Sequence, residues 1–391
     1  MGNIALATKE DIEEVKEMIK DIHSVTYGVS IDLLNSNPET AVTYTDDAVG
    51  MVAGSDDWFN KSIFKDIKPC LFKNGSVVGY LNPNNFAQFE DGTDADITSG
   101  DSGDVMIEIP KMGYKISKSG NTLTVQITDS PKKEGFSYKA HTRTVEGDRE
   151  KLYVGAFLGS HPRGILRSLA NQEALNYVNF KNFRDFAQLS GAGYDLLSFY
   201  PLTLLQCLYL IVYKNLNSQA ALGTGYVGDI DYMYGKKKTG ATISKGMNYG
   251  SADKGEQMKF LGIEDLWGNL MQWIEGLVAT SNEQVFVATD NFNNSGLNYN
   301  SLGVLTIQNT DECMKEPQGN NDTGFIISAG GASTSTYFSD YALFEVLGEG
   351  GTFPIYGGSF SDDDGAGIFK LYLSCPPDYS DYDVGGRLMY L

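Results

Sequence analysis

The sequence predicts an α+β protein in which short strands and loops outweigh helices. Glycine accounts for 44 of the 391 residues and tyrosine for 23, whereas charged residues make up only 20%. This composition is typical of chains with many turns and few long charged helices. Only three stretches have a helical pattern, whereas short apolar runs separated by turn residues recur along most of the chain.

The charge and the residue inventory exclude several classes of function. A net charge of -20 repels phosphate backbones, and no basic stripe with interleaved aromatics is present, so we expect no nucleic-acid binding. No apolar stretch reaches the length of a membrane span, so we expect no membrane insertion. The four cysteines and three histidines lack the spacing of a zinc site, so no metal site is predicted.

Residues 1–26 carry the pattern of a coiled-coil helix. Isoleucine at both the a and the d positions favours trimers or higher oligomers over dimers. We therefore predict a self-associating N-terminal helix; the alternative is one amphipathic helix that packs on its own domain. The positions that alternate at spacings of three and four residues are Ala5, Thr8, Ile12, Val15, Ile19 and Ile22.

Residues 27–95 are predicted to form a small β-rich neck domain. Asn74-Gly75 lies between two apolar runs, which is a strong hairpin signal. A polar segment over residues 94–104 marks the end of this domain. Beyond it we expect strands over residues 105–110, 114–117 and 123–127, then helices over residues 182–189 and 201–213.

Three motifs near the C-terminus occur in a fixed order. Residues 268–273 read Gly-Asn-Leu-Met-Gln-Trp, residues 357–360 read Gly-Gly-Ser-Phe, and Gly386-Arg387 follows. Together they resemble the formylglycine-generating-enzyme type of the C-type lectin fold, whose motifs are Leu-x-Gly-Asn-Val-x-Glu-Trp, Arg-Gly-Gly-Ser-Trp and a terminal Gly-Phe-Arg. Gln272 stands where that family usually has Glu, and Phe360 replaces a Trp. The resemblance implies a C-type lectin-like fold for residues 96–391.

Four residues of these motifs are expected to be structural. Gly268 permits a backbone geometry that a Cβ atom would obstruct, and Asn269 can bond neighbouring backbone in a loop. Trp273 supplies a large buried anchor whose indole N–H needs a partner. Arg387 offers a fork of donors that can pin several loop carbonyls or a carboxylate.

The catalytic apparatus of the copper-dependent enzymes in that family is expected to be absent. Those enzymes need a reactive cysteine pair in the C-terminal region. Here Cys313 and Cys375 stand about sixty residues apart and in the wrong context. We therefore predict no catalytic residue, and we interpret the fold as one reused for binding.

A closer resemblance is to phage and prophage tail proteins that carry this lectin-like domain at the C-terminus. It rests on residues 99–115 and 151–157. Some of these proteins are the variable proteins of diversity-generating retroelements. The resemblance implies a homotrimeric receptor-binding tip on a virion tail, assembled in the host cytoplasm beside other tail proteins. Its partner would be a host cell-surface protein or glycan, and no cofactor is implied.

Residues 356–385 have the composition of a variable, ligand-contacting region. Adenine mutagenesis of Asn codons cannot produce Lys, Glu, Gln, Met or Trp, and within this segment only Lys370 belongs to that set. Tyrosine gives large contact area at low entropic cost, as in antibody paratopes. The alternative is an ordinary Gly- and Asp-rich loop over a β scaffold. The predicted ligand-contacting residues are Tyr356, Phe360, Asp362, Asp363, Phe369, Tyr372, Ser374, Tyr379, Asp381 and Tyr382.

Acidic groups suggest two further possibilities. Residues 362–364 with Asp378, Asp381 and Asp383 could ligate Ca²⁺, but they lack an EF-hand register, so solvated carboxylates are preferred. Glu264-Asp265 is a pair of acids of the kind that glycosidases use. An enzyme on the same fold, either a thiol oxidase or a glycan hydrolase, therefore stays an alternative. A bacterial surface adhesin or a purely structural tail component is another.

Overall fold

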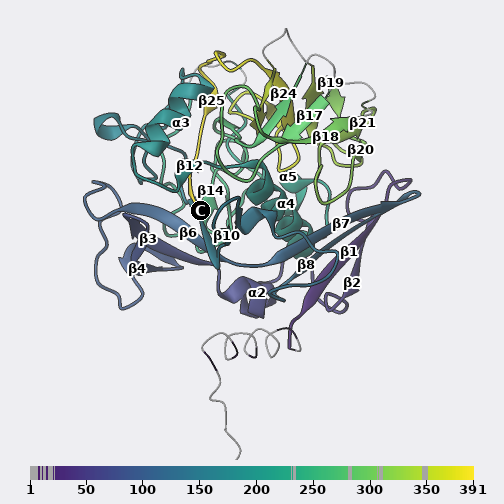
Figure 1. Cartoon of the computed structure of the whole chain (residues 1–391), viewed down its shortest axis with the longest axis horizontal. Helices are drawn as coiled ribbons and strands as arrows, with labels where there is room; N and C mark the ends of the chain where they lie inside the picture. The colour runs from purple at the N-terminus through teal and green to yellow at the C-terminus, as the bar shows by residue number, and fades with distance from the viewer. Residues whose placement is uncertain are drawn as a thin grey trace, which may run out of the picture.

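The computed structural model describes residues 8, 11, 15, 21, 23–229, 231, 235–280, 284–305, 307, 311–345 and 351–391. The helix predicted over residues 1–26 falls mostly outside the described residues. In the described part the chain is mostly β with few helices, as its composition predicts. Figure 1 places the six-stranded sheet at the top of the molecule and two further sheets below it, with helix α4 between them.

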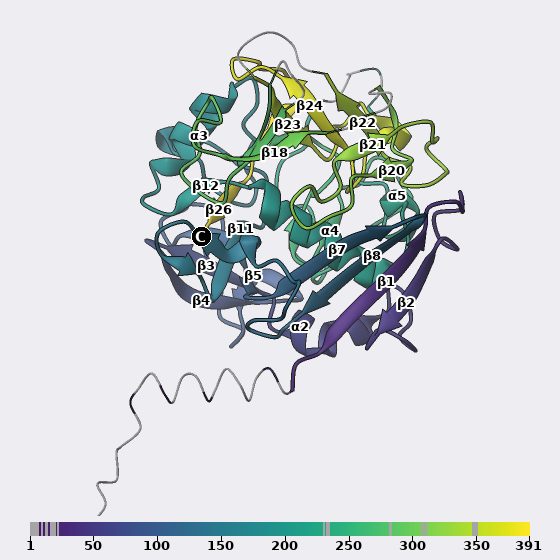
Figure 2. The same ribbon diagram turned by 45° about the vertical axis from the view of Figure 1, so that its right-hand side comes forward.

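A four-stranded antiparallel sheet covers one side of α4 (Figure 2). Its inward side chains, among them Val29, Ile31, Leu123 and Val125, are fully buried, and α4 packs against β1 and β8. The alternation of apolar and polar residues along these strands therefore gives one core face and one solvent face. In spatial order the strands are β2 (Val42–Asp46), β1 (Thr26–Asp32), β8 (Thr122–Thr128) and β7 (Gly113–Ser119).

A seven-stranded sheet includes β26, the last strand of the chain, as an internal strand. Asn74 and Gly75 both have positive φ, 52° and 76°, and close the predicted hairpin between β3 and β4. The last strand, β26, lies between β11 and β12. In spatial order the strands are β12 (Tyr194–Leu196), β26 (Leu388–Tyr390), β11 (Lys151–Gly155), β6 (Asp104–Pro110), β3 (Lys68–Lys73), β4 (Ser76–Asn82) and β5 (Asn85–Phe89).

Strands from both sides of the predicted boundary at residue 95 pair in both of these sheets. In the first sheet Thr26 lies opposite Thr128, and in the second Lys68 lies opposite Glu108. Residues 27–95 therefore share their sheets with the remainder of the chain. The polar segment after residue 94 therefore connects strands that belong to the same sheets.

Both predicted internal helices are present, and each begins two residues earlier than expected. The side chain of Asn179 caps α3 (Phe180–Gln188) by accepting a hydrogen bond from Asn182 N. Every residue of α4 (Phe199–Tyr213) is buried, so α4 forms the centre of the core. The remaining helical elements are η1 (Asp56–Asn60), α2 (Ser62–Lys65), η2 (Lys139–His141), η3 (Pro162–Gly164), α5 (Ser218–Ala221) and η4 (Asp363–Gly365).

The predicted variable region contributes to the six-stranded sheet. In spatial order its strands are β19 (Asp311–Cys313), β22 (Tyr341–Phe344), β24 (Leu371–Cys375), β23 (Phe353–Tyr356), β15 (Met271–Trp273) and β25 (Val384–Gly385). Shorter ladders join β9 (Thr142–Arg143) to β10 (Gly147–Asp148), β13 (Lys259–Phe260) to β14 (Ile263–Glu264), and β20 (Glu316–Pro317) to β21 (Ile327–Ala329). A three-stranded sheet contains β16 (Leu277–Ala279), β17 (Gln284–Val287) and β18 (Asn300–Val304).

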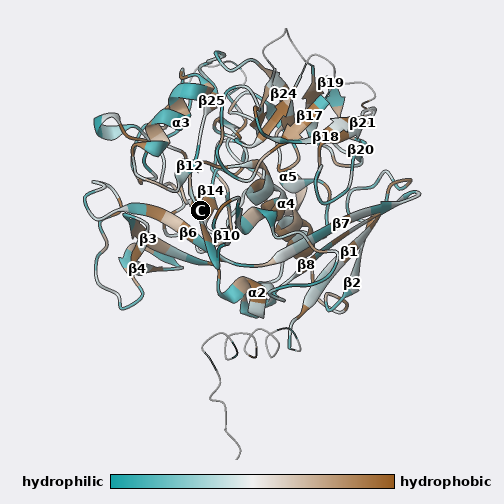
Figure 3. Cartoon of the chain, viewed as in Figure 1, coloured by the Kyte–Doolittle hydropathy of each residue, from teal (hydrophilic) through white to brown (hydrophobic). Residues whose placement is uncertain are grey.

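Hydrophobic residues gather on α4 and on strands such as β24, whereas hydrophilic residues dominate the outer loops (Figure 3). Among the residues that the structure describes, no helix has both the length and the apolar character needed to cross a bilayer.

The last residue of η2 is a histidine that lies in the core. His141 is fully buried, and its Nε2 accepts the backbone N–H of Met112 at 3.4 Å. Its Nδ1 has no hydrogen-bond partner among the described residues. Burial, with a smaller contribution from the nearby Lys111 ammonium, lowers the pKa of His141 to about 3.

We therefore expect His141 to make the fold sensitive to acid. Below pH 6.5 His141 is protonated in the unfolded chain but stays neutral in the folded protein. The free energy of unfolding therefore decreases as the pH falls from 6.5 toward 3. The loss reaches about 1.4 kcal/mol per pH unit. Buried carboxyl groups titrate in the same range, so a urea-unfolding series should compare the wild type with His141→Gln. Their stability difference should change with pH in this window, and a constant difference would refute the assignment.

Candidate ligand-binding surface

A buried guanidinium joins the segments beneath the predicted variable region. Arg387 is fully buried, and its Nε donates to Gln272 Oε1 at 2.8 Å. Nη1 donates to the carbonyl of Gly155 at 2.9 Å, and Nη2 donates to those of Glu264 and Asp265 at 2.7 and 2.9 Å. This geometry matches the structural role expected of Arg387.

The departure at Gln272 from the family motif has a physical reason. The Gln272 amide accepts from Arg387 and donates from Nε2 to the carbonyl of Asp265 at 2.9 Å. An ionised glutamate accepts hydrogen bonds and cannot donate one. With glutamate at position 272, the Asp265 carbonyl would therefore lose the hydrogen bond that Gln272 Nε2 donates. Glutamine therefore satisfies both of its buried neighbours.

The other three motif residues also occupy structural positions. Gly268 has a φ of 77°, and a Cβ atom there would lie 2.9 Å from the carbonyl oxygen of Tyr226. Asn269 accepts from the backbone N–H of Lys237 at 2.9 Å and donates to the Lys237 carbonyl at 3.2 Å, which fixes the neighbouring loop. The buried Trp273 donates from its indole N–H to the carbonyl of Val178 at 3.4 Å.

Four of the ten predicted ligand-contacting residues belong to the core. Tyr356, Phe360, Phe369 and Ser374 are 0, 2, 1 and 8% exposed, so predicting them on the surface was wrong. Tyr356 and Ser374 lie on β23 and β24, two paired strands inside the six-stranded sheet. Phe369 packs against the rings of Phe325, Phe338 and Tyr209, and Phe360 packs against Tyr226. Amino-acid composition does not reveal which face of a strand a side chain occupies.

The acidic residues at the start of the region are paired with lysines. Asp362 forms an ion pair with Lys370, whose side chain is only 2% exposed and lies 4.5 Å from the centre of the Tyr372 ring. Lys254 forms ion pairs with Asp363 and Asp364. Within the described residues no group of acidic, histidine or cysteine side chains is arranged to hold a metal ion.

The end of the region forms a surface that we call the tyrosine surface: Tyr177, Tyr379, Asp381 and Tyr382. The Asp381 carboxylate accepts from the hydroxyl of Tyr379 at 2.9 Å and from the backbone N–H of Tyr382 at 2.7 Å. Its backbone carbonyl accepts from the N–H of Tyr177 at 3.0 Å. The Tyr177 side chain is 66% exposed, and its ring centre lies 6.4 Å from that of Tyr382. Asp381 thus binds the Tyr379 hydroxyl and holds the backbones of Tyr177 and Tyr382 next to it.

Two members of this neighbourhood were missed by the sequence analysis. Asn176 donates from its amide to the carbonyl of Tyr382 at 2.5 Å, and Lys236 donates to Asn176 Oδ1 at 2.6 Å. Asn176 and Tyr177 precede the variable region by about 180 residues, and no motif marks them. Only the folded chain brings them beside residues 379–382.

A buried hydroxyl connects the two ends of the region. Ser359 Oγ lies 3.0 Å from Asp362 Oδ2 and 3.2 Å from Asp383 Oδ2, and its single proton is shared between them. Burial, together with the charges of Asp381 and Asp362, raises the pKa of Asp383 to about 6. Ser359 therefore links the loop that contains Asp362 to the loop that contains Asp383.

The cysteines and acidic residues considered for the enzyme alternatives are buried in the fold. Burial raises the pKa of Cys313 to about 11 and that of Cys375 to about 12, so neither thiol is a ready nucleophile at neutral pH. Glu264 and Asp265 are fully buried. The Glu264 carboxylate accepts from the backbone N–H groups of Gly240 and Thr242, which is a structural role.

No protein-family model matches the sequence, and the comparison with curated proteins gave no match. Among solved structures, the chain is similar to one titled "Major Tropism Determinant M1 Variant", at 11% identity and a TM-score of 0.33, over 84% of each chain. A second, "Structure of PvdO from Pseudomonas aeruginosa", has 11% identity and a TM-score of 0.28, over 76% of this chain and 97% of that one. Similarities this weak carry no argument about fold or function.

Proposed function

We propose that this chain is a receptor-binding protein of a phage or prophage tail, and that the tyrosine surface contacts a molecule on the host cell. The observation that carries the proposal is the arrangement around Asp381. One carboxylate and its backbone hold three tyrosines from two distant segments next to one another. Tyrosines fixed in this way offer contact area with little entropy left to lose on binding.

The proposal includes a C-type lectin-like architecture, a homotrimer on the virion tail, and diversification of residues 356–385. In such a trimer, avidity would compensate for weak single contacts. Binding would be the whole activity, without catalysis or a cofactor. The ten predicted contact residues reduce to those that reach solvent at least in part: Asp362, Asp363, Tyr372, Tyr379, Asp381 and Tyr382. Tyr177 and Asn176 join them.

The chemistry of the surface favours a ligand with hydrogen-bond donors. Ionised carboxylates only accept hydrogen bonds; Asp381 lies among the tyrosines, and Asp363 and Asp364 lie on η4, where both pair with Lys254. The net charge of -20 also disfavours an acidic partner. A host protein with basic side chains or a glycan with free hydroxyl groups fits these conditions.

The test is the double variant Tyr177→Ala with Tyr382→Ala. We expect binding of labelled protein to intact host cells to weaken by at least about 100-fold, because buried aromatic contacts carry much of an interface's affinity. The melting temperature should stay within a few degrees, since Tyr177 is mostly exposed and Tyr382 is half-buried.

Tyr249→Ala provides the matched control. This half-buried tyrosine contacts Lys245 and Glu256 instead of the tyrosine surface. Its loss should leave cell binding unchanged. Undiminished binding by the double variant would refute the proposal, and a large fall in its melting temperature would assign the tyrosines to the core.

A further inference from the structure

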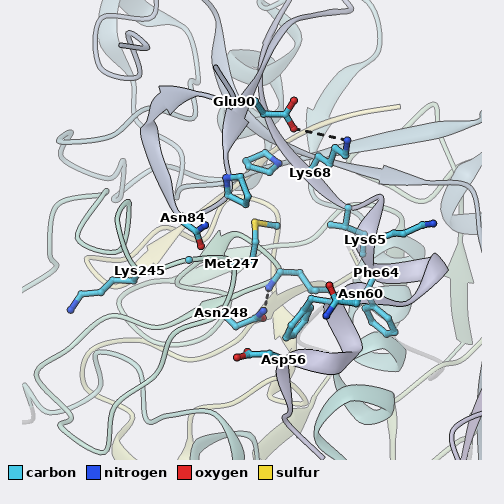
Figure 4. A pocket seen from close by; sticks show the side chains of 16 residues that line it. Asp56, Asn60, Phe64, Lys65, Lys68, Asn84, Glu90, Lys245, Met247 and Asn248 are labelled. Atoms are coloured by element: carbon cyan, nitrogen blue, oxygen red, sulfur yellow. Dashed lines mark hydrogen bonds and ion pairs between the residues drawn. The ribbon is translucent and has the colours of Figure 1, made fainter. Parts of the chain in front are cut away.

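A pocket of about 520 Å³ lies on a different part of the molecule, where η1 and α2 meet the β4–β5 turn and the loop at residues 245–248 (Figure 4). Its volume lies within the range of about 300–1,000 Å³ that is typical of small-molecule sites. A cavity of about 150 Å³ already holds one benzene ring. The pocket shares no lining residue with the tyrosine surface.

The floor of this pocket is apolar. Phe64, Ile67 and Leu261 are buried there, at 3, 4 and 1% exposure. Phe59 and Met247 are half-buried beside them. These side chains come from three separate segments, so the floor exists only in the folded chain.

The rim carries three carboxamides with free hydrogen-bonding capacity. Asn248 Oδ1 accepts the backbone N–H of Leu261 at 2.9 Å, and its Nδ2 has no partner among the described residues. The side chains of Asn60 and Asn84 are exposed and have no hydrogen-bond partner within the described part of the chain. Each free amide group can donate and accept. Asp56 adds an acceptor to the same rim.

The rim's charged groups do not converge on the pocket. Figure 4 shows the side chains of Lys65 and Lys245 extending away from its middle. Lys68 faces Glu90 instead, with 4.0 Å between Nζ and Oε1. The rim carries Asp56 and Glu90 as well as three lysines, so its charges are of both signs. It therefore favours neither an anionic nor a cationic ligand.

We infer that this pocket binds a neutral saccharide unit, as a site separate from the tyrosine surface. The C–H face of a sugar ring would cover the apolar floor, and its hydroxyls, which both donate and accept, would pair with the rim amides. A purely apolar ligand would leave those amides unpaired, which is costly when they lose water. The ligand could be a free sugar or one residue of a surface polysaccharide, since the chemistry is the same.

The test uses saturation-transfer NMR with the full chain. The neutral probes are the methyl glycosides of glucose, mannose, galactose and N-acetylglucosamine. Glucuronate, glucosamine and benzyl alcohol serve as anionic, cationic and apolar probes. We expect saturable binding of at least one neutral glycoside, and affinity at least tenfold weaker in Asn60→Ala with Asn84→Ala. Tighter binding of isolated host-wall polysaccharide than of any glycoside would identify the source as a polymer.

Two controls separate this inference from the proposed function. Asn121→Ala removes an exposed carboxamide from the β7–β8 turn, and Tyr177→Ala with Tyr382→Ala removes the tyrosine surface. Both should bind the glycoside as the wild type does. The inference is wrong if no neutral glycoside binds, if a charged or apolar probe binds in preference, or if the Asn60 and Asn84 substitutions leave the affinity unchanged.

Discussion

Replacing Arg387 with methionine is expected to lower the free energy of unfolding by at least about 4 kcal/mol. The substitution removes the guanidinium donors to four buried acceptors, the carbonyls of Gly155, Glu264 and Asp265 and the amide oxygen of Gln272. The Asp265 carbonyl keeps its second donor, Gln272 Nε2. Each buried acceptor left without a partner costs about 1–3 kcal/mol. Since folded proteins are stable by only about 5–15 kcal/mol, the variant should fold poorly or not at all.

Arg387→Lys keeps the charge and makes the prediction measurable. A single ammonium cannot reproduce the planar fork that reaches several carbonyls at once, so this variant should fold with an intermediate loss of stability. Urea unfolding of the wild type and both variants gives the order. If Arg387→Met lost less than about 1 kcal/mol, the guanidinium would not be what holds these segments together.

The structural role of Arg387 could be predicted from the sequence, whereas the exposure of the side chains within residues 356–385 could not. Arg387 ends a short motif, and its fork of donors allows few other uses in a loop-rich fold. Exposure within residues 356–385 depends instead on which strand faces which layer. Along β24 the apolar–polar alternation buries Leu371 and Leu373 and leaves Tyr372 partly exposed. This pattern could have been predicted from the sequence of the strand alone. In β23 all four residues are buried, so alternation gives no indication for Tyr356.

Long-range pairing explains the other gaps in the prediction. The hairpin at Asn74-Gly75 and helix α4 depend on local signals, and both were predicted. The joining of residues 26–32 to 122–128 depends on contacts across about a hundred residues, and no local pattern specifies it. The same holds for Tyr177, which reaches the tyrosine surface through its hydrogen bond to Asp381 and its ring contact with Tyr382. Local chemistry was therefore predictable, and the assembly of the surface was not.

The second large effect is expected at a buried ion pair between α3 and the segment after β15. Arg184 and Glu275 are 5 and 0% exposed, with 2.5 Å between Nε and Oε1 and 2.9 Å between Nη2 and Oε2. Burial raises the pKa of Glu275 above its ordinary value of 4.5 even beside this guanidinium. Arg184 therefore favours the charged form of Glu275 and opposes the effect of burial.

Arg184→Ala should lower the free energy of unfolding by about 3–5 kcal/mol, because it leaves a buried carboxylate unpaired. The deficit should be largest above pH 8 and shrink as the pH falls toward about 8, the folded pKa of Glu275 in the wild type, because below that value the carboxyl is protonated in both folded proteins. Arg184→Met with Glu275→Leu removes both charges and should recover much of the loss. A double-mutant cycle by urea unfolding measures the coupling. A small, pH-independent deficit in Arg184→Ala would mean that the pair does not stabilise this part of the fold.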